Sequence, residues 1–227
     1  MNCHVFVDFD GTIAPVDTTD LLLERFADPA WQTIEEDWKA GRIGSRECLV
    51  RQIYLVRATP QELDDFVARI DIDPGFAGFI ALCREQGHRV TVVSDGLDRT
   101  VGSVLQRHGF DLPFRANQLK YLGGDRWKLM FPHARSDCRA LSGNCKCQFA
   151  EAAAGLVRIV VGDGRSDFCV AERADLVLAK SSLVRHCRSS NLPHFAFSIF
   201  DEATQLLAAW VEEQATGADR RSELRDE

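Results

Sequence analysis

The sequence has no apolar run that could cross a membrane. No stretch of its 227 residues approaches the roughly 18 consecutive apolar residues that a spanning helix needs, so we expect no membrane partner. The first residues, MNCHVFVDFDGT, lack the basic region and apolar stretch of a signal peptide, which predicts a cytoplasmic location. The chain also contains no internal repeat and no low-complexity segment.

Positive charge is scarce as well. The chain has 27 lysines and arginines against 34 aspartates and glutamates, which gives a formal net charge of -7. Without a basic patch such a surface repels nucleic-acid phosphates, so we expect no nucleic-acid partner. A small phosphorylated metabolite stays compatible with this charge, because a bound metal ion and a single lysine can outweigh it locally.

A disulfide scaffold is a further class that the sequence excludes. The eight cysteines lie in a chain too long and too rich in aliphatic residues for a small disulfide-rich fold, so we expect reduced thiols. Cys138, Cys145 and Cys147 are close in sequence and near His133, but their spacing differs from that of a zinc ribbon or finger. A structural metal site and a loop of reduced thiols both remain open, and the spacing favours the thiols.

What the chain does contain is an alternation of strand and helix patterns. The expected strands are 3–9, 89–94, 157–162, 176–179 and 195–199. The expected helices between and after them are 76–86, 99–108, 148–154 and 202–214. Strands that alternate with helices pair in parallel through right-handed crossovers. The pattern therefore predicts an α/β fold with a doubly wound, Rossmann-like parallel sheet.

Helical patterns alone occupy the segment from residue 15 to residue 74. Helices are expected at 19–26, 30–40 and 45–56, and a fourth begins at the capping box Thr59-Pro60-Gln61-Glu62. We therefore predict an all-helical cap at 15–74, inserted between the core segments 1–14 and 75–227 and lying over the end of the first strand as a lid. The charge-dense tail from about residue 217 is expected to fray.

The segment Asp8-Phe9-Asp10-Gly11-Thr12 places two carboxylates at the end of the first strand. Residues two apart on a strand point to the same side, so Asp8 and Asp10 can face one reacting group. A carboxylate that attacks a phosphate ester meets repulsion of roughly 4 kcal/mol per charge pair at about 4 Å and an effective dielectric constant near 20. A nearby cation must offset this repulsion, and a divalent metal ion bound by oxygen ligands does so.

Polar residues at other strand ends complete the set. Ser94 ends the second strand, Lys146 precedes a helix, and Asp163 and Asp167 follow the third strand. The carboxyl ends of parallel strands meet at one edge of the sheet, where ligands bind. Each motif alone has another explanation: a solvated turn, a calcium loop, or, for the GDG tripeptide at 162–164, a dinucleotide site. Their order along one chain favours chemistry.

This ordered set of motifs resembles the haloacid dehalogenase superfamily over nearly the whole chain. The resemblance implies that Asp8 is a nucleophile that becomes an aspartyl-phosphate, and that Asp10 is the acid for the leaving alcohol and then the base for water. It also implies that Ser94 and Asp95, in the segment VVSDG, bind the phosphate together with Lys146. Dehalogenases of the superfamily lack an acid at the position of Asp10, so a phosphatase is expected.

The resemblance further implies a magnesium site. Its ligands would be the side chains of Asp8 and Asp163 and the main-chain carbonyl of Asp10, with Asp167 in support through hydrogen bonds or water. These are oxygen ligands, the kind that magnesium prefers over softer donors.

The helical cap resembles that of the phosphoserine phosphatase group, with two departures. Asp17 stands where that group has a longer glutamate for the substrate amine. Gln52 stands where that group has an arginine for the serine carboxylate, so a charge-assisted pair is lost.

A closer resemblance is to the bacterial methionine-salvage phosphatases, which act on 2-hydroxy-3-keto-5-methylthiopentenyl-1-phosphate. The shared features are Ala30-Trp31, the Gly96-Leu97-Asp98 that follows Ser94, Phe131-Pro132-His133 and the segment 183–192. Asp95 and Gly164 depart from the usual residues of that family.

We therefore expect hydrolysis of a small phosphomonoester, with Asp17 and Arg51 as the polar cap residues near the substrate. Both can instead be ordinary solvated residues. Three alternatives remain: a phosphoserine phosphatase, a phosphotransferase that passes the phosphoryl group to an alcohol, and a non-catalytic module that binds metal and phosphate. A pure binding module gains nothing from a nucleophile and its acid, which weighs against the third. The sequence does not predict the oligomeric state.

Overall fold

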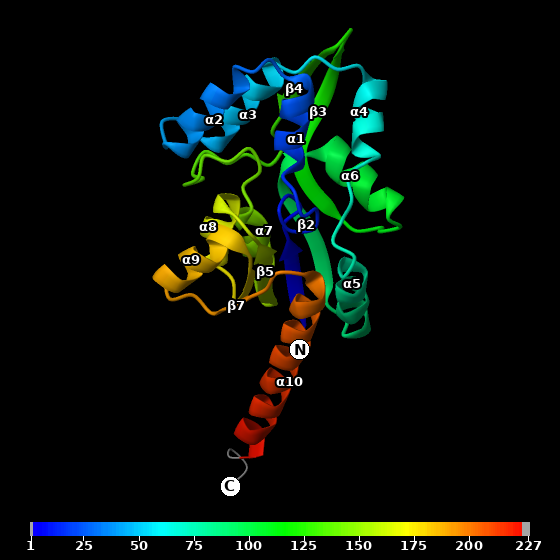
Figure 1. Cartoon of the computed structure of the whole chain (residues 1–227). Coiled ribbons are helices and arrows are strands. Elements are labelled where there is room, and N and C mark those ends of the chain that lie inside the picture. Colours follow the sequence, from blue (N-terminus) through cyan, green and yellow to red (C-terminus); the bar gives the residue numbers. More distant parts are fainter. Residues whose placement is uncertain (1, 224–227) are drawn as a thin grey trace.

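The computed structural model describes the backbone from residue 2 to residue 223 and the side chains as far as residue 216. Its centre is a seven-stranded sheet in the order β4-β3-β2-β1-β5-β6-β7, with helices on both faces (Figure 1). The strands are β1 (Cys3–Val7), β2 (Arg89–Leu97), β3 (Phe114–Gly123), β4 (Arg126–Met130), β5 (Val157–Gly162), β6 (Leu176–Ala179) and β7 (His194–Ala196). The expected α/β, Rossmann-like fold class is confirmed.

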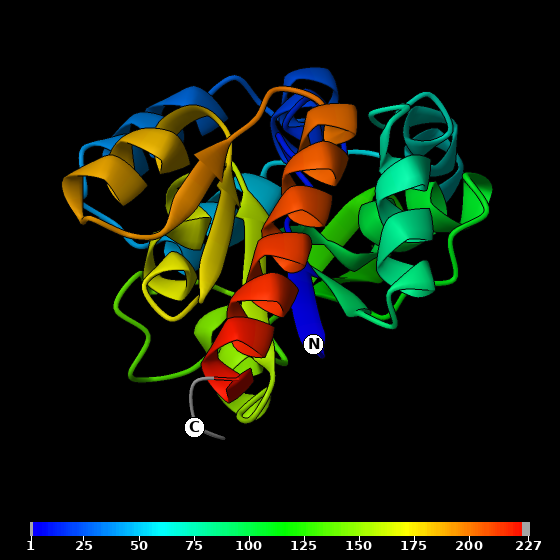
Figure 2. The ribbon, with the colours of Figure 1, turned by 90° about the horizontal axis from the view of Figure 1, so that it is seen from below.

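Six helices belong to the part of the chain that follows the first helical segment. They are α5 (Phe76–Glu85), α6 (Asp98–Arg107), α7 (Cys147–Ala152), α8 (Phe168–Ala171), α9 (Ser181–Ser189) and α10 (Phe200–Glu223). Seen from below, α10 runs beside α5 (Figure 2). The short α8 and the longer α9 are absent from the sequence prediction.

The central strand β1 shows why helices cover both faces. Its side chains alternate, so Val5 and Val7 pack with α5 and α10, whereas Phe6 packs on the other face with α7 and Val170 of α8. A parallel strand buried on both faces carries a nearly continuous apolar run, and in the segment CHVFV only His4 interrupts it. β1 pairs in parallel with β2 and with β5, so the carboxyl ends of all three strands lie at one edge.

The sheet is mixed at one edge, where the structure has a hairpin that the sequence analysis does not predict. β4 pairs antiparallel with β3, and the chain turns through Gly123 and Gly124, whose φ angles of 102° and 65° favour glycine. Trp127 and Leu129 of β4 are buried between exposed neighbours and join an apolar cluster with the helices of the cap segment.

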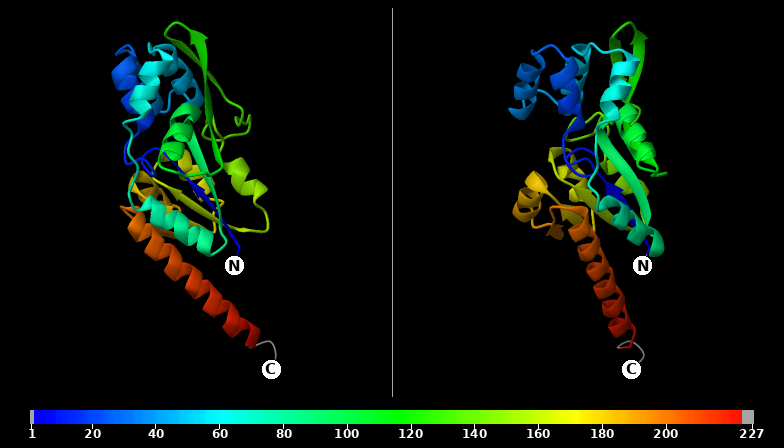
Figure 3. Two further views of the ribbon diagram at one scale, coloured as in Figure 1. Left: turned by 90° about the vertical axis from the view of Figure 1, so that its right-hand side faces the viewer. Right: turned by 45° about the vertical axis from the view of Figure 1, so that its right-hand side comes forward.

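Four helices occupy the segment expected to form the cap: α1 (Thr18–Phe26), α2 (Trp31–Lys39), α3 (Ser45–Tyr54) and α4 (Pro60–Val67). Thr59 and Glu62 form the capping box that the sequence predicts at the start of α4. These helices and the β3–β4 hairpin lie at the same end of the molecule (Figure 3). The division into segments 1–14, 15–74 and 75–227 stays a prediction, and the hairpin adds residues outside 15–74 to this end.

The C-terminal helix is longer than expected. The tail predicted to fray from about residue 217 begins within α10, which continues to Glu223, and its last residues, 224–227, lie outside the described part. In the described residues, no helix combines the length and the apolar character that a membrane span requires.

Candidate active site

Asp8 lies directly beyond the end of β1, where its backbone N–H donates to the carbonyl of Val161 at 2.8 Å. The chain then turns through Gly11, whose φ of 70° lies in the left-handed region. A Cβ atom on Gly11 would lie 2.5 Å from Oδ2 of Asp163, so only glycine allows this loop to approach the end of β5. The turn therefore brings Asp8 and Asp163 together.

Lys146, at the start of α7, forms a buried ion pair with two carboxylates. Its Nζ is 2.8 Å from Oδ1 of Asp8 and 2.7 Å from Oδ1 of Asp167, and it donates to Oγ of Ser166 at 3.0 Å. Burial disfavours the charged ammonium group, but attraction to Asp167 and Asp8 outweighs burial and raises the pKa of Lys146. Lys146 is therefore a fixed positive charge beside Asp8.

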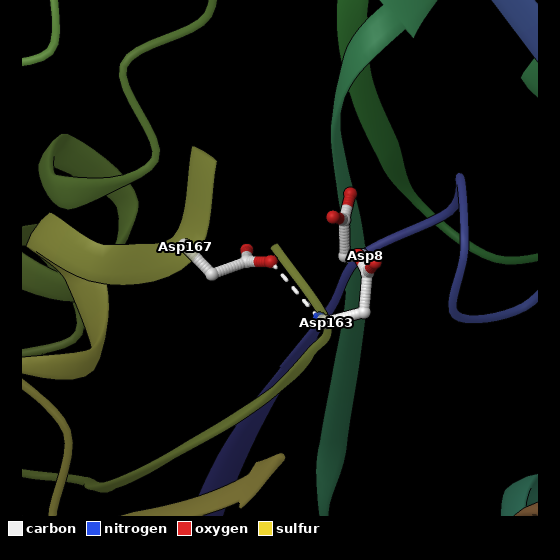
Figure 4. Close-up of side chains that lie close together, drawn as sticks. All are labelled: Asp8, Asp163 and Asp167. Carbon is white, nitrogen blue, oxygen red and sulfur yellow. Dashed lines mark hydrogen bonds between the residues drawn. The ribbon is translucent and has the colours of Figure 1, made fainter. Parts of the chain in front are cut away.

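Asp8, Asp163 and Asp167 each offer one carboxylate oxygen, and these oxygens lie within 4.8 Å of one another. Figure 4 shows the three side chains converging beyond the ends of β1 and β5. Burial raises the pKa of Asp163 to about 6 and that of Asp8 well above its ordinary value, and the charge of Asp167 raises both further. Crowded carboxylate oxygens without a soft donor fit a hard divalent cation such as magnesium.

The cysteine-rich segment before α7 does not share this geometry. Within the described part of the chain, the three aspartates are the one group with spacing suited to a metal ion. Cys138, Cys145 and Cys147 are buried and pack with Phe6 and Val93 in an apolar cluster. This packing favours reduced thiols over a structural metal site.

Asp10 is held by the start of α1. Its Oδ1 accepts from the backbone N–H of Thr18 at 2.8 Å and from the Thr18 hydroxyl at 2.5 Å, and Ser94 Oγ donates to its Oδ2 at 3.3 Å. Burial raises the pKa of Asp10 to about 7, the charge of Asp17 adds to the rise, and the hydrogen bonds from Thr18 and Ser94 oppose it. A carboxyl group with a pKa near 7 can donate and accept a proton at neutral pH.

Ser94 is fully buried within β2, next to Asp10, in the irregular stretch between Val93 and Leu97. The strand therefore continues to Leu97, beyond the end at residue 94 that the sequence predicts. The Oγ of Ser94 accepts from the backbone N–H of Gly96 at 2.9 Å. A Cβ atom on Gly96 would lie 2.5 Å from Oδ2 of Asp10, so the missing side chain leaves room for that carboxylate. The structure thus brings Ser94 to Asp10, as the ordered set of motifs predicts.

A cavity of about 460 Å³ lies between these carboxylates and the cap helices. Its size is in the range of small-molecule sites. On the core side it is lined by Asp8, Asp10, Gly11, Asp95, Gly96, Asp163, Gly164, Arg165, Ser166 and Ser181. On the cap side it is lined by Pro15, Asp17, Thr19, Asp20, Glu35, Trp38, Ser45, Cys48, Leu49 and Gln52. The cap wall is therefore partly acidic and partly apolar.

Asp17 lines this cavity, as expected, and it also caps α1. Its Oδ1 accepts from the backbone N–H groups of Thr19 at 2.9 Å and Asp20 at 3.0 Å. These bonds satisfy two of the free N–H groups at the helix start. Asp17 thus has a structural task beside any contact with a substrate.

Arg51 is not among the residues that line the cavity. It is exposed on α3 and pairs with Glu47 of the same helix. Its neighbour Gln52 faces the cavity instead, is only 2% exposed and donates to Oε2 of Glu35 at 3.0 Å. The structure therefore does not favour the predicted contact of Arg51 with a substrate, which stays a prediction, and Gln52 is the polar side chain of α3 that faces the cavity.

Asp95 lines the cavity, but its carboxylate is bound by donors of the protein itself. Ser45 Oγ donates to Oδ2, while the amide of Asn117 and the backbone N–H of Asn144 donate to Oδ1. An anion in this position repels a phosphate. Binding of phosphate by Asp95 stays a prediction, and the hydrogen bonds of its carboxylate do not favour a direct contact of that side chain with phosphate.

The sequence analysis missed two polar contacts of the site, Thr18 with Asp10 and Ser166 with Lys146. The contact of Thr18 could have been anticipated from the sequence, because Asp17 is an N-cap residue and the helix begins directly after it. No sequence pattern indicated the contact of Ser166, because serine is common in polar loops.

A buried lysine lies beside the carboxylate of Asp8, and a second carboxylate, that of Asp10, has a raised pKa. Both lie at the carboxyl edge of a Rossmann-like sheet, together with three carboxylate oxygens whose spacing suits a metal ion. The fold and the site thus define a hydrolase of phosphate esters. The chain belongs to the haloacid dehalogenase-like hydrolase family, whose model matches residues 5–172, and it is a phosphatase.

Its relatives include two proteins named 2-hydroxy-3-keto-5-methylthiopentenyl-1-phosphate phosphatase. The one from Brevibacillus brevis is 31% identical over 209 residues, covering 89% of this chain and 94% of the relative. The one from Geobacillus kaustophilus is 31% identical over 210 residues, with the same coverage of 89% and 94%.

Among solved structures, a phospho-aspartyl intermediate analogue of phosphoserine phosphatase matches with a TM-score of 0.70 at 20% identity, covering 91% of this chain and 98% of that chain. A substrate-bound phosphoserine phosphatase matches with a TM-score of 0.64 at 22% identity, covering 82% and 90%. At such identities these likenesses show the shared fold.

Proposed function

We propose that this phosphatase uses magnesium and an aspartyl-phosphate on Asp8 to hydrolyse a small phosphomonoester, 2-hydroxy-3-keto-5-methylthiopentenyl-1-phosphate. The observation that carries the proposal is the surroundings of Asp8, which has Lys146 at 2.8 Å and one carboxylate oxygen each of Asp163 and Asp167 within 4.8 Å of its own. A carboxylate so surrounded can approach a phosphate, because positive charge offsets the repulsion.

In the first step a carboxylate oxygen of Asp8 attacks phosphorus, and the bond from phosphorus to the ester oxygen breaks. Asp10 gives its proton to that oxygen, so the product leaves as a neutral alcohol. In the second step Asp10 takes a proton from water while the water oxygen attacks the phosphorus on Asp8, which releases inorganic phosphate and restores both residues. Lys146 offsets the negative charge in both steps.

Magnesium would be held by the carboxylates of Asp8 and Asp163 and the carbonyl of Asp10, with Asp167 in support. It would supply positive charge for the phosphoryl oxygens. Ser94 Oγ is buried and donates to Asp10 at 3.3 Å, so it would bind a phosphoryl oxygen by giving up that hydrogen bond.

Two features support the methylthio substrate. Relatives that align over most of their length carry this name. The cap side of the cavity presents Trp38, Cys48 and Leu49, which suit an apolar methylthio group, while its carboxylates can accept hydrogen bonds from substrate hydroxyl groups.

Phosphoserine is the second candidate. The carboxylates of Asp17, Asp20 and Glu35 line the cap side of the cavity and could bind an ammonium group. The serine carboxylate has less support, because Gln52 cannot form a bidentate ion pair and Arg165 is the one cationic side chain among the described residues that line the cavity.

The test is kcat/KM for both substrates with the wild type and with Gln52→Arg. We expect the wild type to prefer the methylthio substrate by tenfold or more, about 1.4 kcal/mol, and Gln52→Arg to shift the ratio toward phosphoserine. A tenfold wild-type preference for phosphoserine would overturn the substrate assignment in favour of the second candidate. Phosphate release measured with and without an added alcohol separates hydrolysis from phosphotransfer.

A further inference from the structure

The carboxylate of Asp95 joins three segments that are far apart in the sequence. Ser45 Oγ, from the start of α3, donates to its Oδ2 at 2.6 Å. Asn117 Nδ2, from β3, donates to its Oδ1 at 3.1 Å and to its main-chain carbonyl at 2.5 Å. The backbone N–H of Asn144 donates to Oδ1 at 2.9 Å. Such charge-assisted hydrogen bonds are stronger than those between neutral groups.

Two of these segments belong to the catalytic core. Asn144 lies two residues before Lys146, and its side-chain amide donates to the carbonyls of Ser94 at 2.7 Å and Arg115 at 2.9 Å. Asn144 is 1% exposed, so these bonds lie out of contact with water. Through Asn144, Asp95 connects the segment that carries Lys146 to strand β2, which carries Ser94.

The third segment is α3, which forms part of the cap-side wall of the cavity. Ser45 is the first residue of α3, and Cys48, Leu49 and Gln52 of the same helix line the cavity. The helix start is also held by the backbone, because the N–H of Arg46 donates to the carbonyl of Leu141 at 3.1 Å. The hydrogen bond from Ser45 to Asp95 is a side-chain link between α3 and the core side of the cavity.

We propose that Asp95 is a positioning residue, and that its hydrogen bond with Ser45 holds α3 against the core while its bond with Asn144 places Lys146. The first bond fixes the position of α3 beside the cavity, and the second fixes the position of the Lys146 ammonium group beside Asp8. The kinetic part of this proposal rests on the proposed phosphatase reaction. The part that concerns α3 stands on the geometry of the protein alone.

Ser45→Ala tests whether the hydrogen bond from Ser45 to Asp95 holds α3 in place. Alanine removes the hydroxyl and favours a helix more than serine does, so α3 loses its link without losing helix propensity. With p-nitrophenyl phosphate we expect KM to rise about tenfold, as for the loss of a hydrogen bond to a charged group, and kcat to stay within about twofold. Ser45→Thr keeps the hydroxyl and should restore KM.

Asp95→Asn tests the second bond. Its side chain is neutral and its amide nitrogen cannot accept, so all three hydrogen bonds are weakened or lost, and we expect kcat to fall about tenfold in addition to the rise in KM. In the double variant with Ser45→Ala, the rise in KM should be no greater than in Asp95→Asn alone, because both changes act on the same hydrogen bond between residues 45 and 95.

Hydrogen exchange of the backbone amides, measured without substrate, tests the position of α3 independently of enzymatic activity. Ser45→Ala should speed amide exchange across α3 about tenfold and leave α4 unchanged. Thr59→Ala is the matched control, since it removes the capping box of α4 far from the cavity and should speed exchange in α4 with normal KM.

The outcomes separate the two proposals. A protein with no phosphatase activity but faster α3 exchange in Ser45→Ala contradicts the proposed reaction and keeps the link between Ser45 and Asp95. An active phosphatase in which Ser45→Ala changes neither KM nor α3 exchange overturns the link. A kcat of Asp95→Asn equal to that of the wild type overturns the placement of Lys146 by Asp95.

Discussion

Lys146 places its Nζ 2.8 Å from Oδ1 of Asp8, and this pair is almost completely buried. Asp163 and Asp167 stand beside it, so three carboxylates share one ammonium group. When all four groups are ionised, two negative charges remain without a partner in a region of low dielectric constant. Uncompensated buried charge is costly, and a divalent cation would balance it.

Magnesium binding should therefore stabilise the protein in the absence of substrate. At a concentration of about 100 times the dissociation constant, binding adds about 2.7 kcal/mol to the free energy of unfolding. We expect a rise in Tm of several degrees that excess chelator reverses, together with loss and recovery of activity. Asp163→Asn should lose most of this rise, whereas Asp111→Asn, on an exposed loop, should keep it.

Unchanged Tm on addition of magnesium, together with full activity in excess chelator, would contradict the magnesium requirement. Zinc or manganese in place of magnesium tests whether the oxygen ligands discriminate between cations.

Asp10→Asn should affect substrates according to their leaving groups. An alkyl phosphate needs a proton on its leaving oxygen, so its kcat/KM should fall by about a hundredfold or more. p-Nitrophenol leaves as an anion without that proton, so kcat/KM for p-nitrophenyl phosphate should fall far less. Because kcat/KM reports the steps up to the first phosphoryl transfer, the comparison isolates the acid role from the later base role. Equal losses for both substrates would refute that acid role.

Asp20 should make the stability of the cap depend on pH. Burial raises its pKa to about 7, the carboxylates of Asp17, Glu35 and Glu24 add to the rise, and Lys39 opposes it. An acid whose pKa is higher in the folded chain binds its proton more tightly there. Its contribution is therefore fully present below about pH 4 and is lost as the pH rises through about 7. Asp20→Asn removes this dependence.

Thermal unfolding in chelator measures the effect. We expect the Tm of Asp20→Asn to exceed that of the wild type by about 2 °C or more near pH 8, and the difference to vanish near pH 4. Asp111→Asn should track the wild type at both values. A difference that stays constant with pH would show that the carboxylate of Asp20 is not the cause.

The central strands and the proximity of Asp8 and Asp163 could be predicted because they depend on short local patterns. Apart from His4, the run CHVFV is apolar on both faces, and parallel strands bring their carboxyl ends to one edge, so Asp8 and Asp163 had to lie close together. The β3–β4 hairpin could not be predicted in this way. In Arg126–Met130 only Trp127 and Leu129 are buried, and the apolar surface that covers them comes from the distant cap helices.

The surroundings of the cavity depend on contacts that no local pattern encodes. Asp95 meets Ser45 and Asn144 across 50 and 49 residues of sequence, so its neighbours became visible only in the folded chain. Arg51 and Gln52 differ by one position, yet neighbours on a helix point about 100° apart. This difference in direction places Gln52 at the cavity and Arg51 outside it. The apolar residues of α3 indicate its buried face, but not precisely enough to predict which of these two neighbours faces the cavity.

The central claim is that Asp8 itself carries the phosphoryl group. Sodium borohydride reduces an acyl phosphate to an alcohol, so adding it during turnover should convert the phosphorylated aspartate into homoserine, which peptide mass spectrometry locates. We expect homoserine at residue 8 that appears only with substrate and magnesium, and none in Asp8→Asn, which lacks the nucleophile and should also show no turnover. Continued turnover with unmodified Asp8, or homoserine at Asp10 or Asp163 instead, would contradict the account.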